Sequence, residues 1–342
     1  MTDNNGIRSG SLQFYPRVRA KKIIPGVNWK PLDKSSKDDP AGPDGVGFMG
    51  FVGYKVGMVS VWAKDSTVDS MTKGKKIIVP ATLIECPAMK IYSVRFYKNG
   101  KVASDVVVSN DKILKKSLKV GKIIGKIDDS IEFDDVRVIM YSGVGKTGIG
   151  KKKVDMVEVG VSGDKDSKLA FIKENIGKEI SVSDVFSEGL VDVRGVTKGY
   201  GTNGPMKRFG IALKSHKSEK GQRRPGNIAP WHPARTTFRS PQAGQTGYHS
   251  RVCYNNLILE SGKLTDRDAT QAIGGRWQVA GGNQRRDVNK AGGYKQYGVL
   301  KNDYLILRGS IPGPAKRGIF VTQALRPTNY QAKKKFEVLE LR

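Results

Sequence analysis

The sequence predicts a mainly β protein of the α+β class, in which a small barrel carries an α/β insertion and a long basic segment. Two runs of strand composition, 91–98 and 101–108, are joined by Asn99-Gly100, a two-residue hairpin signal. Closely spaced glycines between positions 45 and 57 favour the strand crossings of a barrel corner. The segment Val193–Leu259 has no periodic apolar pattern, so a separate extended part is expected.

The composition points to a polyanionic partner. The chain has 342 residues and a net charge of +28. Because such an excess of positive charge repels itself in the folded state, a partner that supplies counter-charge is expected, and nucleic acid is the usual one. An anionic membrane is the competing partner, but the sequence shows no basic amphipathic helix with an aromatic face. Hydrophobic residues make up 38%, which is enough for a buried core.

A soluble, cytoplasmic protein is expected. The N-terminal residues, MTDNNGIRSGS, contain no apolar signal region. The run Gly45–Trp62 approaches the length of a membrane span, but Lys55 and five glycines interrupt it, so a buried pair of glycine-rich strands is expected instead. Cys86 and Cys253 have no CxxC spacing, which indicates free thiols of a reducing compartment.

Residues 1–44 are predicted to form an extended N-terminal arm. Five prolines between positions 16 and 43 interrupt any helix, and cations are spread through the segment. One interpretation is a solvated tail. The other is a nucleic-acid-binding arm that becomes ordered on contact.

The remaining elements are predicted from strand and helix signals in chain order. The segment 45–108 is expected to be the first part of the barrel, with a further strand over 76–85. The segment 109–178 is expected to be the α/β insertion, with helices over 111–119 and 164–175 and strands over 136–140 and 154–161. Gly177 follows the end of the second helix, as a C-terminal glycine does.

The barrel is expected to resume after the insertion. The segment 179–196 returns to strand composition, and 252–342 holds the rest of the barrel and the C-terminal segment. Strands in this last part are predicted over 252–260, 298–307 and 318–324. The intervening segment 197–251 is predicted to form a long basic finger.

The basic segment lacks the means to fold alone. Between Val193 and Leu259 there are twelve Lys and Arg residues and a single acid, Glu219, together with all three histidines of the chain. Too few apolar side chains are present to offset the entropy of ordering it. A solvated surface usually mixes charges of both signs, which this segment scarcely does. It is therefore predicted to lie against a polyanion.

Side chains suited to RNA recur in this segment. Its arginines offer planar, bidentate groups to phosphates and base edges. Trp231, Tyr248 and the histidines offer stacking surfaces, each worth roughly 1–3 kcal/mol per stacked base. In Pro230-Trp231-His232-Pro233, two prolines fix the backbone around the tryptophan. A rigid tip that presents Trp231 to RNA is favoured over a core position.

Two motifs resemble the nucleotide-binding motifs of enzymes, but neither is complete. Met140 occupies the position where a phosphate-binding loop would need a glycine before Gly145-Lys146-Thr147. The spacing of Gly199, Gly201 and Gly204 matches a dinucleotide fingerprint, but Pro205 and a basic run follow where a helix should begin. Those glycines are more consistent with close backbone approach to a phosphate or a strand.

Metal and nucleophile chemistry are also disfavoured. The three histidines are loosely spaced for a zinc site, even with His249 and Cys253 four residues apart. Apart from Glu219, no carboxylate lies near them in sequence to orient a catalytic base.

Several motifs together resemble one ribosomal family. VDVRGVTKGYGTNGPMKRFG, PWHPAR and QAGQTGYHSR are similar to the third protein of the large ribosomal subunit, in its archaeal and eukaryotic form. GFMGFVGYKVGM, KKKVDMVEVG and KNDYLILRGSIPGPAKR extend this resemblance over essentially the whole chain.

The resemblance implies a six-stranded β-barrel of the translation-protein type on the subunit surface. It also implies that the finger runs through ribosomal RNA towards the peptidyl transferase centre, with Trp231 near the tip and the N-terminal arm alongside. Roles in subunit assembly, tRNA accommodation and elongation-factor entry follow by analogy, while peptide-bond chemistry would belong to the RNA.

The chain departs from the family pattern in two places. The run Tyr200–Asn203 is less basic and less aromatic than the family's usual pattern. Glu219 stands where related eukaryotic proteins carry a modified histidine, so no such modification is expected here.

The expected function is that of a structural ribosomal protein that binds large-subunit rRNA and neighbouring ribosomal proteins. No catalytic residue, metal, cofactor, membrane contact or small-molecule substrate is predicted. A free RNA chaperone or assembly factor and an RNA-modifying enzyme are the alternatives. The predicted rRNA-binding residues are Arg17, Arg19, Lys21, Lys22, Lys198, Lys207, Arg208, His216, Lys217, Arg223, Arg224, Trp231, His232, Arg235, Arg239, Gln245, Tyr248, His249 and Arg251.

Overall fold

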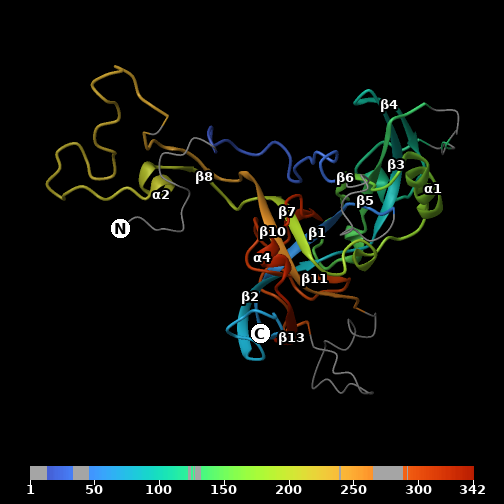
Figure 1. The fold of residues 1–342 in the computed structure, drawn as a ribbon. Helices are drawn as coiled ribbons and strands as arrows, with labels where there is room; N and C mark the ends of the chain where they lie inside the picture. The colour runs from blue at the N-terminus through green and yellow to red at the C-terminus, as the bar shows by residue number, and fades with distance from the viewer. Residues whose placement is uncertain are drawn as a thin grey trace. The chain divides into compact units, whose positions relative to one another are not determined.

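The computed structural model describes residues 14–33, 46–121, 125, 127, 132–238, 240–264, 288–290 and 292–342. The chain divides into two compact units (Figure 1). The first, called here the β unit, comprises Ile24–Gly195 and Val252–Arg342. The second, called here the basic unit, comprises Val196–Arg251 and the described residues up to Ile23. None of the described helices is long and apolar enough to cross a membrane.

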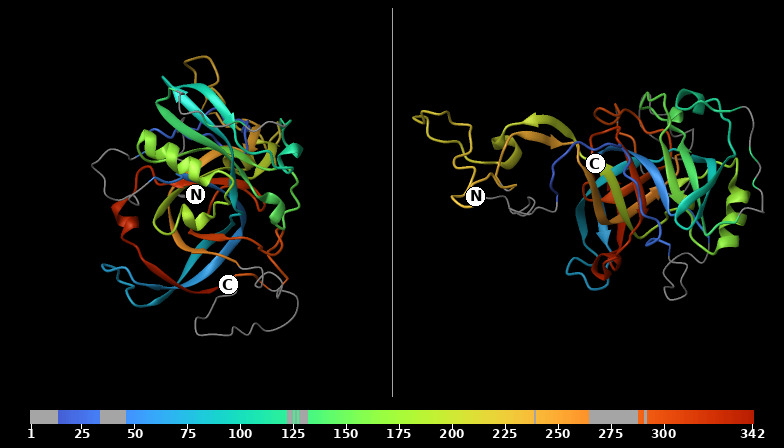
Figure 2. Two further views of the ribbon diagram at one scale, coloured as in Figure 1. Left: turned by 90° about the vertical axis from the view of Figure 1, so that its right-hand side faces the viewer. Right: turned by 90° about the horizontal axis from the view of Figure 1, so that it is seen from above.

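A seven-stranded sheet forms the larger part of the β unit. Neighbouring strands follow the order β12-β7-β10-β11-β2-β1-β13, and β12 pairs in addition with β1. The sheet is strongly curved (Figure 2). Its strands are β1 (Gly50–Asp65), β2 (Lys76–Glu85), β7 (Leu190–Val196), β10 (Ser250–Gly262), β11 (Tyr304–Arg308), β12 (Gly318–Gln323) and β13 (Phe336–Leu341).

Strand β1 organises this sheet because it pairs with three others. It runs antiparallel to β2, its first residues pair with β12, and its last residues pair with β13. The expected pair of glycine-rich strands is therefore one continuous strand. A Cβ on Gly50 would lie 2.6 Å from the Phe320 ring, and one on Gly53 would lie 2.4 Å from Ile84. Glycine is needed at these positions so that the core side chains can approach the backbone.

A four-stranded sheet, in the order β4-β3-β5-β6, forms the rest of the β unit. Its strands are β3 (Met89–Lys98), β4 (Lys101–Val107), β5 (Asp135–Ser142) and β6 (Met156–Gly160). The Asn99-Gly100 hairpin joins β3 to β4, with positive φ at both turn residues. The predicted first barrel segment, 45–108, includes this hairpin, but β3 pairs with β5 instead of the larger sheet. The hairpin thus shares a sheet with β5 and β6, which lie in the segment 109–178.

The helical elements agree only in part with the sequence-based expectations. Helix α1 (Lys165–Asn175) forms where it is predicted, with Ile172 buried and Gly177 at φ 80° after its end. The expected helix over 111–119 is reduced to a single 3-10 turn, Leu114–Lys116. Within the predicted strand segment 179–196, Ser181 and Asp184 form a capping box on a 3-10 turn, so the strand β7 begins only at Leu190. A short helix, α4 (Asn329–Ala332), precedes β13.

Candidate nucleic-acid interface

A short hairpin is the scaffold of the basic unit. Strands β8 (Gly199–Asn203) and β9 (Gly244–Gly247) pair antiparallel, with a bulge between Gly199 and Gly201. Gly247 has φ 69°, and a Cβ there would lie 2.0 Å from the Lys198 carbonyl oxygen. Only glycine fits so close a crossing. Gly247 was not among the glycines expected to allow a close approach; of those, a Cβ on Gly199 would lie 3.3 Å from Tyr248, and one on Gly201 or Gly204 would meet nothing within 4 Å.

Helix α2 (Pro205–Phe209) follows β8 directly. Gly204 occupies its N-cap and Pro205 its first turn, where a missing N–H has no cost. Gly210, at φ 68°, ends the helix and donates to the Met206 carbonyl. A helix at this point was not predicted from the sequence. With only five residues, it does not meet the requirement of a dinucleotide fold for a long helix.

The segment 211–243 forms a long loop without helix or strand in its described residues (Figure 1). Its local hydrogen bonds are few, such as that from the Lys214 N–H to the Gln222 carbonyl (3.2 Å). Trp231 is 89% exposed and Phe238 79%, so neither is a core residue. The ring of Trp231 contacts that of His232 edge to face, with centroids 6.1 Å apart. The loop thus presents aromatic and cationic side chains to solvent.

The N-terminal arm packs along the hairpin instead of forming a free tail over its first described residues. The Ala20 N–H donates to the Tyr248 carbonyl at 2.8 Å. Nδ1 of His249 lies 2.9 Å from the Val18 carbonyl oxygen. The Arg19 guanidinium lies 5.3 Å from the centre of the Tyr248 ring. The arm and the finger are therefore parts of one structure.

Three arginines gather where the arm meets helix α2 and the end of β9. The Arg17 guanidinium lies 4.4 Å from the centre of the Phe209 ring, and that of Arg208 lies 5.2 Å from the same centre. Arg208 also donates to the Gln245 and Gln242 carbonyls at 3.0 and 3.1 Å. Gly244 leaves room for it, because a Cβ there would lie 2.8 Å from the guanidinium.

The third arginine of this group, Arg251, is held in a similar way. Its guanidinium lies 4.6 Å from the centre of the Phe14 ring, and it donates to the Ser250 carbonyl at 2.9 Å. Arg17, Arg208 and Arg251 are called the arginine cluster below. Aromatic faces and carbonyl oxygens, which carry no full charge, hold all three.

The arginine cluster has no internal counter-charge. Burial, and then the neighbouring charge of Arg17, lower the pKa of Arg208 and the pKa of Arg251. Among the described residues, none of the three forms an ion pair with a carboxylate. Like charges brought together in this way favour the binding of an anion.

The predicted site residues fall into two groups. Those of the arginine cluster and the hairpin are half-buried, namely Arg17, Arg208, Gln245, Tyr248, His249 and Arg251. The others are exposed, namely Arg19, Lys21, Lys22, Lys198, Lys207, His216, Lys217, Arg223, Arg224, Trp231, His232 and Arg235. Arg239 lies outside the described residues. The structure brings the first group together, while the second is spread along the arm, the hairpin and the loop.

Phe14, Tyr15 and Phe209 were missed by sequence reasoning. Each has a cluster arginine over its ring. Their signal in the sequence is the alternation of aromatic and basic residues in FYPRVR and KRF. This signal indicates cation–π packing, but it does not say which arginine meets which ring.

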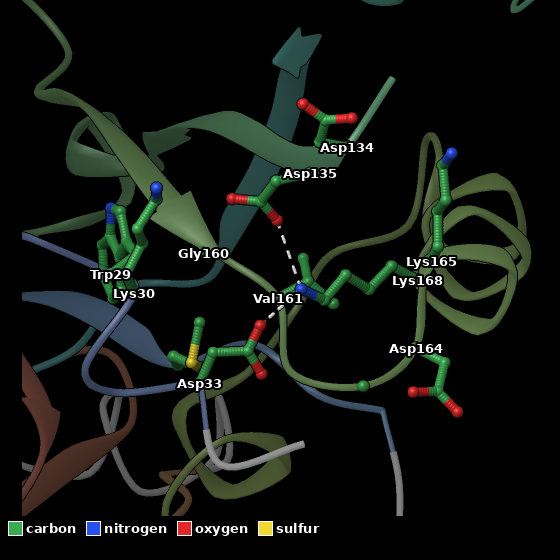
Figure 3. Close-up of a pocket in the computed structure, with 12 residues that line it drawn as sticks. Trp29, Lys30, Asp33, Asp134, Asp135, Gly160, Val161, Asp164, Lys165 and Lys168 are labelled. Carbon is green, nitrogen blue, oxygen red and sulfur yellow. Dashed lines mark hydrogen bonds and ion pairs between the residues drawn. The ribbon is translucent and has the colours of Figure 1, made fainter. Parts of the chain in front are cut away.

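The β unit contains a hollow of about 470 Å³ between Trp29–Asp33, the strands β5 and β6 and the start of α1 (Figure 3). Lys168 reaches into it and contacts Asp33 at 2.5 Å and Asp135 at 3.2 Å. The Lys168 side chain is only 7% exposed, so the two carboxylates neutralise a buried charge. The hollow is thus an ion-paired junction that joins β5 and α1 to Asp33, which lies in the predicted arm but belongs to the β unit.

No other chemical site emerges from the described part of the chain. No group of three or more His, Cys, Asp or Glu side chains there is placed to hold a metal ion. Cys86 is buried and Cys253 is half-buried, and both are free thiols.

Comparison with known proteins identifies a consistent set of relatives. The model of the family "Ribosomal protein L3" matches residues 1–109 and 108–341. The large ribosomal subunit protein uL3 of Methanocella arvoryzae is 35% identical, over 94% of this chain and 93% of its own length. The uL3 proteins of Archaeoglobus fulgidus and Methanococcoides burtonii are each 36% identical, over 94% and 93% of this chain and 92% of their own lengths.

Proposed function

The chain belongs to the ribosomal protein L3 family and is a structural component of the large ribosomal subunit, not an enzyme, and we propose that its basic unit binds the rRNA of that subunit. The observation that carries this proposal is the arginine cluster together with the exposed cations and aromatics of the loop. Cations without carboxylate partners, interleaved with aromatic rings, suit a phosphate backbone with splayed bases.

The long loop is proposed to be a finger that extends through rRNA towards the peptidyl transferase centre. Trp231 supports this role because it is exposed, and in the described part of the chain its one aromatic contact is His232. The arm residues Arg19, Lys21 and Lys22 would accompany the finger along the RNA. Since the described part of the loop makes few internal hydrogen bonds, RNA contacts would supply most of its order.

Six strands of the β unit are proposed to form the closed barrel of the translation-protein type, namely β1, β2, β11, β10, β7 and β12. The support is that β12 and β1, which are distant in the strand order, pair from Gly50↔Thr322 to Tyr54↔Gly318. The proposed segments are the arm (1–44), the barrel segments (45–108, 179–196 and 252–342), the insertion (109–178) and the finger (197–251). The hairpin β3–β4 pairs with the strands of the insertion.

Large-subunit rRNA and neighbouring ribosomal proteins are the proposed partners, and the cytoplasmic ribosome is the proposed location. Support for subunit assembly is proposed on the same basis, because a basic segment with no core of its own brings RNA segments together as it becomes ordered.

Sedimentation of large subunits through a high-salt sucrose gradient tests this function. A constitutive component remains in equal amounts with the other subunit proteins, because its contacts are many and partly buried. A free RNA chaperone or an RNA-modifying enzyme would be released by salt. Release of this chain from otherwise intact subunits would contradict the proposal.

A further inference from the structure

We propose that the arginine cluster is a preformed site for one phosphate group of an RNA backbone, and that this phosphate locks the N-terminal arm onto the β8–β9 hairpin before the loop engages RNA. This inference rests on the proposed function, since it takes the ligand to be RNA. It goes beyond that function in two ways. It names a phosphate site that exists in the free protein, and it gives the order in which the parts of the basic unit bind RNA.

The first argument is that the three guanidinium groups are already in place. Arg17 is held by the Phe209 ring, Arg208 by two backbone carbonyls, and Arg251 by the Phe14 ring and the Ser250 carbonyl. A guanidinium has five N–H donors, and these contacts use at most two on any one of them. The remaining donors can reach phosphate oxygens, for which the planar guanidinium group is suited.

The second argument is electrostatic. Arg17 and Arg208 contact the same Phe209 ring, and Arg251 contacts Phe14 of the arm. The charge of Arg17 also lowers the pKa of both Arg208 and Arg251. No carboxylate in the described residues offsets this repulsion, although the chain has 32 Asp and Glu residues in all. A bound phosphate would offset the repulsion between the three guanidinium groups and accept charge-assisted hydrogen bonds from them.

The third argument concerns the arm. Arg17 and Phe14 belong to the arm, whereas Arg208, Phe209 and Arg251 belong to the finger segment. An anion bound by all three arginines would therefore tie together two parts of the chain that are nearly two hundred residues apart. In the described residues, the arm is otherwise held by a hydrogen bond from Arg17 to the Arg208 carbonyl (3.4 Å), by contacts at Val18 and Ala20 and by the stacking of arginines on rings.

The order of binding follows from the difference between the cluster and the loop. The cluster side chains are half-buried and fixed, so little conformational entropy is lost when they bind. Trp231 and the cations of the loop are exposed, and ordering them opposes binding. The cluster is therefore expected to fill at lower RNA concentration than the loop.

Hydrogen exchange of the full chain, followed by mass spectrometry, tests this order. The Ala20 amide, bonded to the Tyr248 carbonyl, reports on the arm, and the Lys214 amide, bonded to Gln222, reports on the loop. The chain is titrated with a short single-stranded RNA, with sodium phosphate, and with sodium chloride at equal ionic strength. Protection of the arm is expected at an RNA concentration about tenfold below that for the loop. Phosphate is expected to protect the arm more than chloride does.

Two variants make the test specific. Arg17→Gln is expected to raise the RNA concentration that half-protects the arm by about tenfold, because it removes one charge-assisted contact. Lys30→Gln, at an exposed cation of the β unit outside the predicted rRNA-binding residues, is the matched control and is expected to change it by about threefold or less. The exchange pattern of the β unit should be the same in both, which shows that each variant is folded.

Several outcomes would overturn the inference. These are loop protection at the same or lower RNA concentration than arm protection, equal effects of Arg17→Gln and Lys30→Gln, and chloride as effective as phosphate. Protection by free phosphate but not by RNA would exclude the RNA backbone as the ligand. In each of these cases RNA can still protect the loop, so the proposed function is tested separately. If RNA protected neither part, the proposed function itself would fail.

Discussion

The Arg17 guanidinium stacks on the ring of Phe209, 4.4 Å from its centre, and so joins the N-terminal arm to the start of the finger. The same ring contacts Arg208 on the segment of the finger that carries it. One aromatic side chain thus brings together two cations that would otherwise repel each other. This arrangement explains how a unit with so few acids forms defined contacts in the absence of RNA.

Replacement of this ring is expected to loosen the arm. Phe209→Leu removes two cation–π contacts, each worth about 0.5–2 kcal/mol. Trypsin should then cleave faster after Lys21 and Lys22, while the melting temperature of the β unit stays unchanged. Phe238→Leu, at an exposed position in the same segment, is the control. Equal cleavage rates in both variants would show that Phe209 does not hold the arm.

The two tryptophans Trp231 and Trp29 are expected to give opposite results. Trp231→Ala should change the unfolding free energy by no more than about 0.5 kcal/mol, because the side chain is 89% exposed. It should weaken rRNA binding by about 1–3 kcal/mol through lost stacking. Trp29→Ala should instead destabilise the fold by about 3–5 kcal/mol, since Trp29 is 3% exposed and packs on Phe320.

Thermal unfolding and filter binding on the same preparations separate these effects. A large drop in melting temperature for Trp231→Ala would mean that this tryptophan supports the fold. Unchanged rRNA affinity would mean that it does not contact the RNA.

The salt dependence of rRNA binding should follow the number of cations in the loop. The logarithm of the binding constant should fall against the logarithm of salt concentration by roughly 0.7–0.9 per phosphate neutralised. The double variant Arg223→Gln/Arg224→Gln should reduce this slope by about two phosphate contacts. The control, Lys115→Gln/Lys116→Gln, removes equal charge from an exposed turn of the insertion and should leave the slope nearly unchanged. A flat slope for the unaltered chain would mean that stacking or shape dominates.

Acid stability should depend on Asp65, a buried carboxylate at the end of β1. Burial alone would raise the pKa of Asp65, but hydrogen bonds from Ser70, Thr72 and Thr67 outweigh it and hold the pKa well below its usual range. A carboxyl whose pKa is lower when folded stabilises the protein above its unfolded pKa of about 3.9, and this contribution is lost as the pH falls through the folded value.

Asp65→Asn is therefore expected to reduce stability at neutral pH by about 1.5–3 kcal/mol, the value of hydrogen bonds to a charged group. When the pH is lowered below about 4, the unfolding free energy should fall less in this variant than in the unaltered chain. Urea unfolding at a series of pH values measures this difference. Asp69→Asn, at an exposed position of the same turn, is the control. Parallel pH profiles for Asp65→Asn and the unaltered chain would contradict the role of Asp65.

Local signals were sufficient for some elements of the fold. Strand β2 has the predicted bounds, 76–85, and helix α1 lies within one residue of its prediction. Apolar runs, a helix start and a following glycine mark these elements in the nearby sequence. The partner of a strand is not marked in this way, because it depends on residues far along the chain. The hairpin β3–β4 was accordingly placed in the wrong sheet.

The candidate site, like the fold, could be predicted from the sequence only in part. The excess of cations and the exposure of Trp231 could be predicted, because composition and flanking prolines determine them. The arginine cluster could not, because it depends on the arm lying beside β9, a contact between opposite ends of the sequence of the basic unit. The sequence places Phe209 next to Arg208, but only the fold shows that Arg17 also contacts its ring.

Tryptic digestion of the free chain and of the assembled large subunit tests most directly whether the basic unit is an rRNA-binding structure. The bonds after Lys220 and Arg223 are exposed in the free chain and lie in the loop that RNA is proposed to cover. Cleavage there is expected to be rapid in the free chain and strongly suppressed in the subunit. Equal rates of cleavage in the two states would contradict the account.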